Sequence, residues 1–290
     1  MSSWTAADLP SFAGRRVIVT GANSGLGEIT ARELARVGAS VVLAVRNVEK
    51  GAAAAAGMTG DVEVRRLDLQ DLASVREFAD GTEPGVDVLV NNAGIMAVPY
   101  ALTKDGFESQ IGTNHLGHFA LTNLLLPKIT DRVVTVSSGL HLLGYISLDD
   151  LNWKARPYLA WPAYGQSKLA NLLFTSELQR RLDAAGSPLK AHAAHPGYSS
   201  TNLQSHGAGG VSGSLLALAN RTVATPADFG ARQTLYAVSQ DLPGDSFIGP
   251  KYSMRGPTAR VARGPLARSA TKARALWELS EQLTETEFPL

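Results

Sequence analysis

The chain has 290 residues, of which 44% are hydrophobic and 18% charged, and 27 Lys and Arg against 26 Asp and Glu leave a net charge of +1. This ordinary globular composition excludes a disordered or collagen-like chain, and the balanced charge argues against general electrostatic binding of nucleic acid. The absence of cysteine excludes disulfides, thiolate catalysis and cysteine-bound zinc or iron–sulfur clusters.

The first residues lack the basic start and apolar run of a secretory signal, and no segment reaches the ~18 consecutive apolar residues of a membrane helix. We therefore expect a cytoplasmic chain without a membrane anchor, folded as one domain over 1–290.

Short β-branched runs alternate with longer helical patterns, which is typical of parallel strands joined by crossover helices. Roughly 20 to 25 residues separate the first four runs, enough for one helix after each strand. We predict an α/β fold: a Rossmann-type, doubly wound parallel sheet flanked by helices. The predicted strands are 17–20, 40–45, 62–67, 86–91, 132–137 and 189–195.

A glycine-rich loop directly follows the first predicted strand and precedes a helical pattern. Glycine at these positions allows a tight turn and close approach of the backbone to a pyrophosphate, which the helix N-terminus also attracts. The position between strand and helix therefore favours a dinucleotide site over a structural turn. The residues expected to bind the cofactor here are Gly21, Asn23, Ser24, Gly25, Leu26 and Gly27.

The end of the second strand indicates which dinucleotide is bound. An acid there would bind the ribose 2′-hydroxyl of NAD, whereas an arginine suits the 2′-phosphate of NADP. The strand ends at Arg46, and the nearest acid, Glu49, falls in the next helix. We predict NADP(H), with NAD as the alternative; an exposed arginine without a ligand is the other interpretation of Arg46.

Tyr164 and Lys168 are spaced to share one face of a predicted helix. A free phenol has a pKa near 10, and a neighbouring ammonium together with the positive ring of an oxidised nicotinamide could lower it. Tyr164 would then exchange a proton with an alcohol or carbonyl near neutral pH. Such pairs also occur on amphipathic helices without any function.

Two long connections, at about 139–163 and 198–224, interrupt the strand–helix rhythm and are expected to form substrate loops. Neither concentrates the cations that a phosphorylated or carboxylated substrate would need, since only Lys154, Arg156 and Arg221 occur in them. Their apolar side chains suit either a small apolar alcohol or carbonyl substrate, or simple packing of the loops. These side chains are Leu140, Leu142, Leu143, Tyr145, Ile146, Leu148, Leu151, Trp153, Tyr158, Leu159 and Trp161, then Leu203, Leu215, Leu216 and Leu218.

The tail carries seven Lys and Arg and no acid over 251–274, then four Glu and no base up to residue 290. We predict a solvated helix face here, with an acidic partner as the alternative.

The motifs described so far are joined by Asn91-Asn92-Ala93-Gly94 after the fourth strand and by Ser137-Ser138 after the fifth. In this order, over roughly 14–255, they resemble the short-chain dehydrogenase/reductase family. The resemblance implies that Tyr164 is the acid/base and that Lys168 holds the ribose hydroxyls, while Ser138 binds the substrate oxygen and Asn114 supports a proton relay. It also implies that the cofactor is lined by Asp68, Leu69, Asn92, Ala93, Gly94, Tyr164, Lys168, Pro196, Gly197, Ser199 and Thr201.

A narrower resemblance is to the retinol dehydrogenase-like branch of that family. It is carried by Arg46 and by the stretches 137–141, 149–152, 167–171 and 276–280. The branch implies NADP(H) and lipophilic alcohols, aldehydes or ketones. Membrane-bound retinol dehydrogenases carry an N-terminal apolar anchor that is missing here, which puts retinol itself in doubt.

Other functions fit the sequence less well. The Gly-x-Ser-x-Gly elbow of serine hydrolases is absent. His192 and His195 would point to opposite faces of a strand, and the helical pair His115 and His118 lacks a nearby acid, so no metal is expected. A dinucleotide-binding sensor or scaffold without turnover remains the main alternative, an epimerase or dehydratase remains open within the enzymes, and so does assembly into a homo-oligomer.

Overall fold

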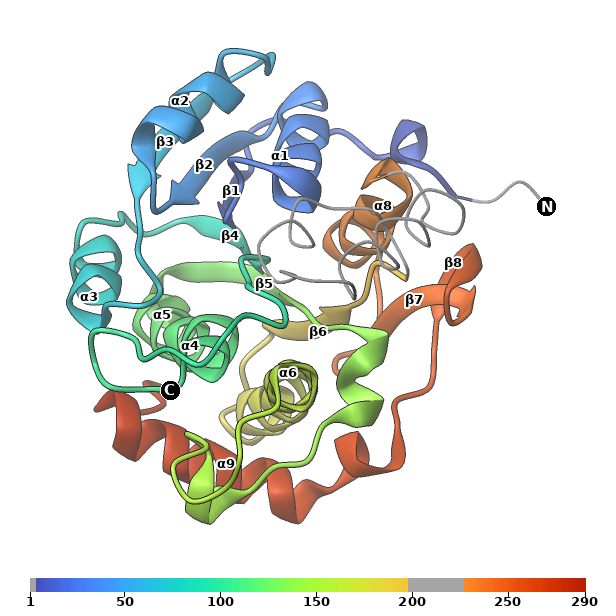
Figure 1. Ribbon diagram of the computed structural model, residues 1–290. Helices are drawn as coiled ribbons and strands as arrows, with labels where there is room; N and C mark the ends of the chain where they lie inside the picture. The colour runs from blue at the N-terminus through green and yellow to red at the C-terminus, as the bar shows by residue number, and fades with distance from the viewer. Residues whose placement is uncertain (1–3, 198–226) are drawn as a thin grey trace, which may run out of the picture.

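The computed structural model describes residues 4–197 and 227–290, and these contain one eight-stranded sheet (Figure 1). The strand order is β3-β2-β1-β4-β5-β6-β7-β8, with parallel pairing throughout except between β7 and β8. This order is the doubly wound arrangement of nucleotide-binding folds, so the predicted Rossmann-type sheet is confirmed. The strands are β1 (Arg16–Thr20), β2 (Ser40–Val45), β3 (Val62–Arg66), β4 (Val86–Asn91), β5 (Ile129–Val136), β6 (Lys190–Ala194), β7 (Phe247–Tyr252) and β8 (Arg255–Arg260).

All six predicted strands are present, and β2 and β4 have the predicted bounds. β5 begins three residues earlier than predicted, at Ile129, because its first residue already pairs with Val86 of β4. The β7–β8 hairpin was not predicted. Its strands contain Gly249 and Pro250 in one and Gly256 and Pro257 in the other, residues that weaken a strand pattern.

Helices cover both faces of this sheet (Figure 1). The α-helices are α1 (Gly25–Arg36), α2 (Val48–Ala55), α3 (Leu72–Asp80), α4 (Ser109–Ile111), α5 (Gly117–Leu125), α6 (Ala160–Ala184), α8 (Ala227–Ser239) and α9 (Ala270–Thr284). A π-helical turn, η2 (Gly112–Leu116), joins α4 to α5. The 3-10 turns are η1 (Ala6–Asp8), η3 (Leu126–Lys128), η4 (Gly139–Leu143), η5 (Leu148–Asp150) and η7 (Pro265–Arg268).

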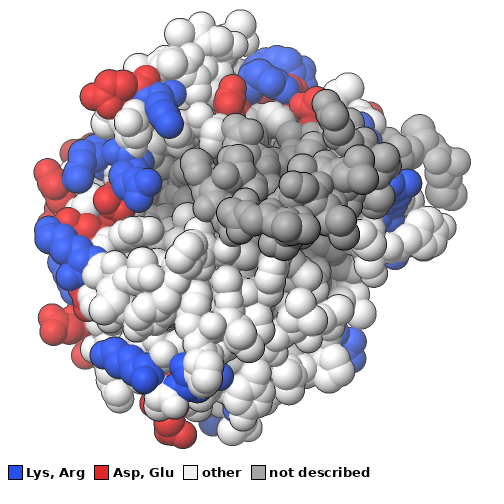
Figure 2. Space-filling view, viewed as in Figure 1, with Lys and Arg blue, Asp and Glu red and all other residues white. Residues whose placement is uncertain are grey.

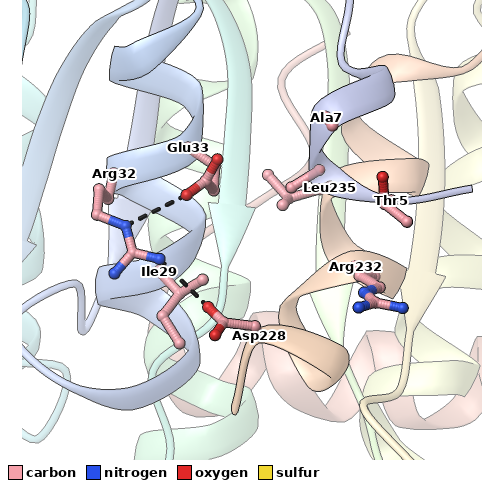
Figure 3. Close-up of a pocket in the computed structure, with 9 residues that line it drawn as sticks. Thr5, Ala7, Ile29, Arg32, Glu33, Asp228, Arg232 and Leu235 are labelled. Carbon is pink, nitrogen blue, oxygen red and sulfur yellow. Dashed lines mark hydrogen bonds and ion pairs between the residues drawn. The ribbon is translucent and has the colours of Figure 1, made fainter. Parts of the chain in front are cut away.

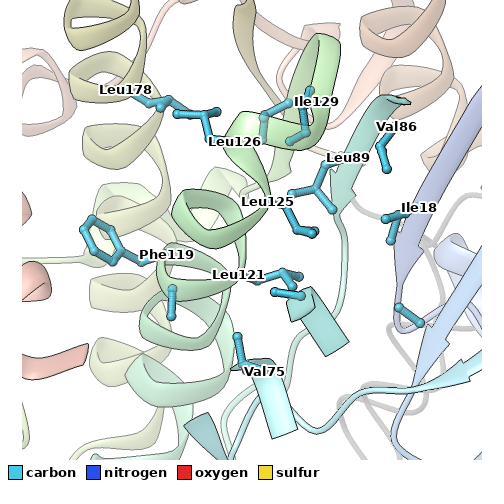
Figure 4. Packing of buried hydrophobic residues seen from close by; sticks show 14 of the residues in the cluster. Ile18, Val75, Val86, Leu89, Phe119, Leu121, Leu125, Leu126, Ile129 and Leu178 are labelled. Atoms are coloured by element: carbon cyan, nitrogen blue, oxygen red, sulfur yellow. The ribbon is translucent and has the colours of Figure 1, made fainter. Parts of the chain in front are cut away.

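The central strands β1, β2, β4, β5 and β6 are buried on both faces, so each supplies side chains to cores on both sides of the sheet, whereas β3 and β8 at the edges are largely exposed or half-buried. In β1, Val17 and Val19 belong to the core under α1 and α8, whereas Ile18 between them belongs to the core under α3, α5 and α6. Figure 4 shows this second core, in which Leu121 and Leu125 point from α5 toward the strands, whereas Phe119 points from α5 toward α6. The alternation explains why the strands consist of continuous β-branched runs.

The C-terminal helix α9 extends the second core with an aromatic cluster. Trp277 is fully buried, stacks on Phe174 of α6 at 5.6 Å between ring centroids, and contacts Phe119 of α5 edge-on at 4.9 Å. This packing fixes α6, the helix that carries Tyr164 and Lys168, against its neighbours.

The basic stretch 251–274 does not form the predicted solvated helix face. It runs through the β7–β8 hairpin and η7 and only reaches the start of α9. Arg263 within it is buried, pairs with the Asp245 carboxylate at 2.6 Å, and donates to the Asp245 carbonyl at 2.7 Å. The prediction holds only for the end of the tail, where Arg274 and Glu278 are exposed on α9.

Charged side chains are unevenly distributed over the surface. In Figure 2, Lys, Arg, Asp and Glu gather along the left-hand rim and the top, whereas the face over the start of α6 and over η4 is mostly uncharged. Within the described ranges, no helix is long and apolar enough to cross a membrane.

Candidate active site

The carboxyl ends of the central parallel strands bring the predicted site residues to one edge of the sheet. β1 ends at Thr20, β4 at Asn91 and β5 at Val136, and their pairing aligns these ends in register. The glycine-rich loop, the Asn92–Gly94 segment and Ser138 follow directly. Ligands of open α/β sheets bind at this edge, and the sequence motifs predicted the site at the same edge.

The glycine-rich loop has the conformation that a dinucleotide pyrophosphate requires. Gly21 and Gly25 have positive φ angles of 65° and 58°, and a side chain on Gly21 would lie 2.9 Å from Ala93. A Cβ on Gly27 would lie 2.6 Å from the Gly21 carbonyl oxygen and would overlap the Asn92 amide. The loop leads into the N-terminus of α1, so the residues present fit a bound dinucleotide.

Thr20 connects this loop to the segment after β4. Its hydroxyl oxygen accepts from the backbone N–H groups of Asn92 and Ala93, each at 2.9 Å. The Asn92 side-chain amide in turn donates to the Thr20 carbonyl at 2.8 Å. The two predicted cofactor segments therefore form one unit. Gly94 continues it, and a Cβ there would lie 3.0 Å from Asn114 Oδ1 and 3.5 Å from Lys168 Nζ.

Three further predicted cofactor residues follow the outer strands β2 and β3. Arg46 follows β2, is exposed, and forms no ion pair with any described residue. Asp68 follows β3, where its carboxylate accepts from the Gln70 backbone at 3.0 Å, and Leu69 is buried beside it against Gly117. The conformation of the loop at Asp68 is therefore stabilised by hydrogen bonding and packing within the protein.

Tyr164 lies in the first turns of α6 and is 7% exposed. Burial raises the pKa of its phenol to about 12, while a hydrogen bond with Ser138 acts in the opposite direction. The charges of Lys168 and of a bound oxidised nicotinamide predicted a lowered pKa for Tyr164. In the structure the desolvation of the phenol outweighs its hydrogen bond.

Lys168 lies one turn further along α6, with its Nζ atom 5.7 Å from the centroid of the Tyr164 ring. Nζ donates to the Val136 carbonyl at 3.0 Å, which fixes the ammonium at the end of β5. Burial lowers the pKa of Lys168 to about 8, so the charged form still predominates at neutral pH.

Asn114 lies in the π-helical turn η2 and is fully buried. Its side-chain oxygen accepts from the Ile95 backbone at 2.8 Å, and its amide donates to the Ile95 carbonyl at 2.9 Å and to Ser167 Oγ at 2.8 Å. Ser167 donates to the Tyr164 carbonyl at 2.8 Å. The Asn114 side chain thus connects the segment after β4 to the helix of Tyr164.

Ser138 caps η4, where its hydroxyl accepts from the Leu140 backbone at 3.1 Å. The ring of His141 holds the Ser138 backbone: its Nδ1 lies 2.7 Å from the Ser138 carbonyl, and its Nε2 accepts from the Gly264 N–H at 3.0 Å. Burial lowers the pKa of His141, so the neutral form that can both donate and accept is favoured.

The apolar side chains of the first long loop are buried, half-buried or exposed, and the half-buried ones are Leu140, Leu148 and Tyr158. Ile146, Leu151 and Trp153 are buried and anchor the loop to α6 and its neighbours. The exposed group consists of Leu142, Leu143, Tyr145, Leu159 and Trp161. Packing therefore accounts for only part of the apolar character of this loop.

The predicted segment after β6 is described only at its beginning. Gly197 has a φ of 70°, and a Cβ there would lie 2.8 Å from the Met254 carbonyl oxygen in the β7–β8 hairpin. Pro196 lies directly before it. Ser199, Thr201 and the loop 198–224, with its four leucines, lie outside the described residues.

Two hollows on the described surface lie away from these residues. One, of about 380 Å³, lies between η1, α1 and α8, where Arg32 pairs with Glu33 and Asp228 (Figure 3). The other, of about 1040 Å³, lies where the end of α9 meets Arg181. Neither is lined by Ser138 or Tyr164. Over 4–197 and 227–290, no cluster of histidines and carboxylates could hold a metal ion.

Two histidines that were not predicted as site residues, His118 and His141, contact the predicted ones. His118 was considered only as half of a metal pair, yet its ring lies 2.9 Å from Thr20 Oγ1 and 3.1 Å from the Asn114 carbonyl. Its spacing of four residues from Asn114 on a helix was the available signal.

Comparison with known proteins places this chain in a family. The family model described as "short chain dehydrogenase" matches residues 15–150. Human retinol dehydrogenase 13 is 43% identical over 297 residues, covering 95% of this chain and 86% of that protein, and human retinol dehydrogenase 12 is 41% identical over 286 residues, covering 93% and 86%.

Solved structures agree with this result. An uncharacterised protein from Mycobacterium paratuberculosis shares 67% identity at a TM-score of 0.90, with all of both chains covered. A Beutenbergia cavernae protein described as an NAD(P)-dependent gluconate 5-dehydrogenase, with bound NADP, shares 25% identity at a TM-score of 0.62, covering 82% of this chain and 96% of that one. Together with the strand order and the strand-end motifs, these matches show that the chain belongs to the short-chain dehydrogenase/reductase family of oxidoreductases, in its retinol dehydrogenase-like branch.

Proposed function

We propose that this protein is an NADP(H)-dependent oxidoreductase that interconverts a lipophilic alcohol and its aldehyde or ketone. The observation that carries the proposal is the convergence of Ser138, Tyr164 and Lys168 beside the glycine-rich loop. The relatives named retinol dehydrogenases support alcohol chemistry.

Tyr164 is the proposed acid/base, because its phenol is buried beside the Ser138 hydroxyl, and this contact favours the phenolate form. The substrate oxygen would bind between these two hydroxyl groups. Ser138 orients that oxygen, and Tyr164 gives it a proton during reduction or takes one during oxidation. NADP(H), when bound, supplies or accepts the hydride.

Lys168 has two proposed tasks. Its ammonium favours the phenolate form of Tyr164, which offsets part of the cost of burying that charge. The protons that Nζ does not donate to Val136 can bind the ribose hydroxyls of the cofactor. Gly94 supports this arrangement, since the lack of a side chain leaves room beside Nζ.

Arg46 is the proposed determinant of NADP over NAD, because it is an exposed cation at the end of β2 without an ion pair among the described residues. The NADP bound to the Beutenbergia cavernae protein supports the choice of a nicotinamide dinucleotide. The remaining proposed cofactor residues are Gly21, Asn23, Ser24, Gly25, Leu26, Gly27, Asp68, Leu69, Asn92, Ala93, Gly94, Pro196, Gly197, Ser199 and Thr201.

A lipophilic substrate is proposed because large apolar side chains are exposed near Ser138. Leu142 and Leu143, four and five residues after it, are 66% and 58% exposed. Tyr252 and Met254 are also exposed, on the hairpin that packs against Gly197. An apolar wall around a few polar groups is the usual construction of a small-molecule site.

The function is tested first by turnover. We expect wild-type protein to reduce medium-chain aldehydes with NADPH, followed by absorbance, and Tyr164→Phe to lose about 10² to 10⁴ in rate while its NADPH affinity is unchanged. The exposed Tyr145 provides the control Tyr145→Phe, which should retain activity. Full activity of Tyr164→Phe would reject the proposed mechanism. Absence of turnover with every alcohol, aldehyde and ketone would favour the sensor or scaffold instead.

Cofactor choice is tested with Arg46→Asp, which replaces a cation by an anion at the proposed 2′-phosphate position. We expect the preference to shift toward NAD(H) by at least about tenfold, about 1.4 kcal/mol. Arg274→Asp makes the same charge change at an exposed position on α9 and should leave the preference unchanged. A wild-type protein that binds NAD(H) tenfold more tightly than NADP(H) would contradict the proposal.

Substrate class is tested with aldehydes of increasing chain length. Each methylene buried contributes ~0.8 kcal/mol, so kcat/KM should rise about fourfold per carbon until the site is full. Leu143→Ser should flatten this series. The matched control Leu290→Ser changes an exposed leucine beside Arg181, which lies about 25 Å along α6 from Tyr164, and should not alter the series. A flat wild-type series, or a preference for sugar phosphates, would contradict the lipophilic substrate.

A further inference from the structure

His118 lies at the point where the cofactor segments approach the helix of Asn114. It is 1% exposed, in the first turn of α5 directly after the π-helical turn. Its Nε2 atom lies 2.9 Å from Thr20 Oγ1, and its Nδ1 atom lies 3.1 Å from the Asn114 carbonyl oxygen. The first contact joins residues 98 positions apart in the sequence.

The hydrogen bonds of Thr20 fix which ring nitrogen of His118 carries the proton. The Thr20 hydroxyl oxygen already accepts from two backbone N–H groups, those of Asn92 and Ala93. Its own proton therefore needs an acceptor, and His118 Nε2 at 2.9 Å is closer than the Val90 carbonyl at 3.4 Å. Nε2 thus accepts, and Nδ1–H donates to Asn114.

The electrostatic surroundings of His118 agree with a neutral ring. Burial lowers its pKa to about 4, and the ammonium of Lys168 acts in the same direction. The neighbouring His115 is also kept neutral by burial, with a pKa of about 3. A neutral imidazole can donate from one nitrogen and accept at the other, as both contacts require.

We propose that His118 is a positioning residue that couples the cofactor segments at Thr20 to Asn114 beside Tyr164 and Lys168. The proposal rests on the proposed function for its catalytic part. On one side, His118 orients the Thr20 hydroxyl, which holds the Asn92–Ala93 backbone against the dinucleotide loop. On the other, it holds the backbone of Asn114, whose side chain connects to the Tyr164 helix through Ser167.

Two substitutions of His118 each keep one of its two contacts, to Thr20 or to Asn114, and remove the other. His118→Asn would place an amide N–H near the position of Nδ1 and so keep the donor to the Asn114 carbonyl, but the shorter side chain cannot reach Thr20. His118→Gln would instead keep an acceptor for the Thr20 hydroxyl and lose the donor to Asn114.

The test measures NADPH affinity by fluorescence and kcat at saturating NADPH. We expect His118→Asn to weaken NADPH binding by about tenfold with kcat largely retained, and His118→Gln to lower kcat by about tenfold with NADPH affinity retained. His115→Gln is the matched control: His115 is buried one turn away but contacts Ser280 at 2.9 Å, away from Thr20, and should change neither quantity selectively.

The opposite results overturn the proposal. Equal losses of affinity and kcat in both His118 variants, no loss in either, or the same split in His115→Gln would show that His118 only packs the helix. If a His118 variant fails to fold, Thr20→Val removes the hydroxyl partner and must weaken NADPH binding, with Thr20→Ser retaining it. If wild-type protein binds NADPH but turns over no substrate, the proposed function fails and the affinity measurements alone decide the role of His118.

Discussion

We expect that replacing His192 by leucine will stabilise the protein, and that the gain will grow as the solution becomes acidic. His192 lies in β6 opposite Val134 of β5 and is 0% exposed. Neither of its ring nitrogens has a hydrogen-bond partner among the described residues. His192→Leu therefore removes two unpaired buried polar atoms and introduces a side chain of similar size.

The size of the effect has two parts. An unpaired buried polar group costs about 1–3 kcal/mol, part of which returns at neutral pH when leucine replaces it. In addition, burial, with help from the cations Arg132 and Lys190, lowers the pKa of His192 from 6.5 to about 4. The unfolded chain then binds more protons than the folded one below pH 6.5, so wild-type stability falls between pH 6.5 and about 4. Linkage gives a loss on the order of 2 kcal/mol from this residue by pH 5.

The measurement is urea unfolding of both proteins at pH 7.5 and at pH 5. We expect a midpoint for His192→Leu that is at or above the wild-type midpoint at pH 7.5 and clearly above it at pH 5. His115→Leu separates the two parts, because His115 is also held neutral by burial but has Ser280 as a partner at 2.9 Å. The His115→Leu variant should be less stable than wild type at pH 7.5, and its unfolding midpoint should fall less steeply than that of wild type when the pH is lowered to 5. A His192→Leu midpoint that falls as steeply with acid as that of wild type would refute the reasoning.

Three further changes test the packing and the site. Gly27→Ala should reduce NADPH affinity more than about tenfold, measured by fluorescence, because its Cβ would overlap the Asn92 amide; unchanged affinity would contradict the loop geometry. Trp277→Ala should lower the free energy of unfolding by about 3–5 kcal/mol in urea titrations, since the stack on Phe174 is lost, and a loss below about 1 kcal/mol would mean that α9 packs independently. Leu143→Ser should leave the melting temperature within about two degrees, as exposed residues usually do, and a larger drop would show that Leu143 packs rather than lines a substrate site.

The central parallel strands could be predicted because their burial on both faces requires continuous runs of apolar residues in the sequence. The run 41–45 contains only apolar, buried residues, and the spacing of such runs predicted the doubly wound topology. The β7–β8 hairpin has no such continuous apolar run in its sequence. Gly249 and Pro250 lie in β7, which pairs with β6 through only two residues, so pattern alone could not separate this strand from a loop.

The site was predictable where spacing along the chain determines position. Tyr164 and Lys168 are four residues apart on one helix, and Ser138 lies just after the end of β5, so the fold brings them close together. The burial of a side chain cannot be predicted in this way, because it depends on all the residues that pack around it, including those distant in the sequence. The sequence could not show that desolvation raises the pKa of Tyr164 to about 12 before any ligand binds.

The contacts of His118 and His141 also could not be predicted from the sequence, and the two histidines bind their neighbours in the same way. In each, Nδ1 lies within hydrogen-bond distance of a backbone carbonyl, of Asn114 at 3.1 Å and of Ser138 at 2.7 Å, while Nε2 accepts from a group distant in the sequence. For His141 that group is a backbone N–H, which can only donate, so the ring must be neutral with its proton on Nδ1. Asparagine and glutamine carry donor and acceptor on a single amide and cannot span both contacts. Imidazole can, because its two nitrogens lie on different sides of a rigid ring that tolerates burial, and this explains why histidine occupies both positions.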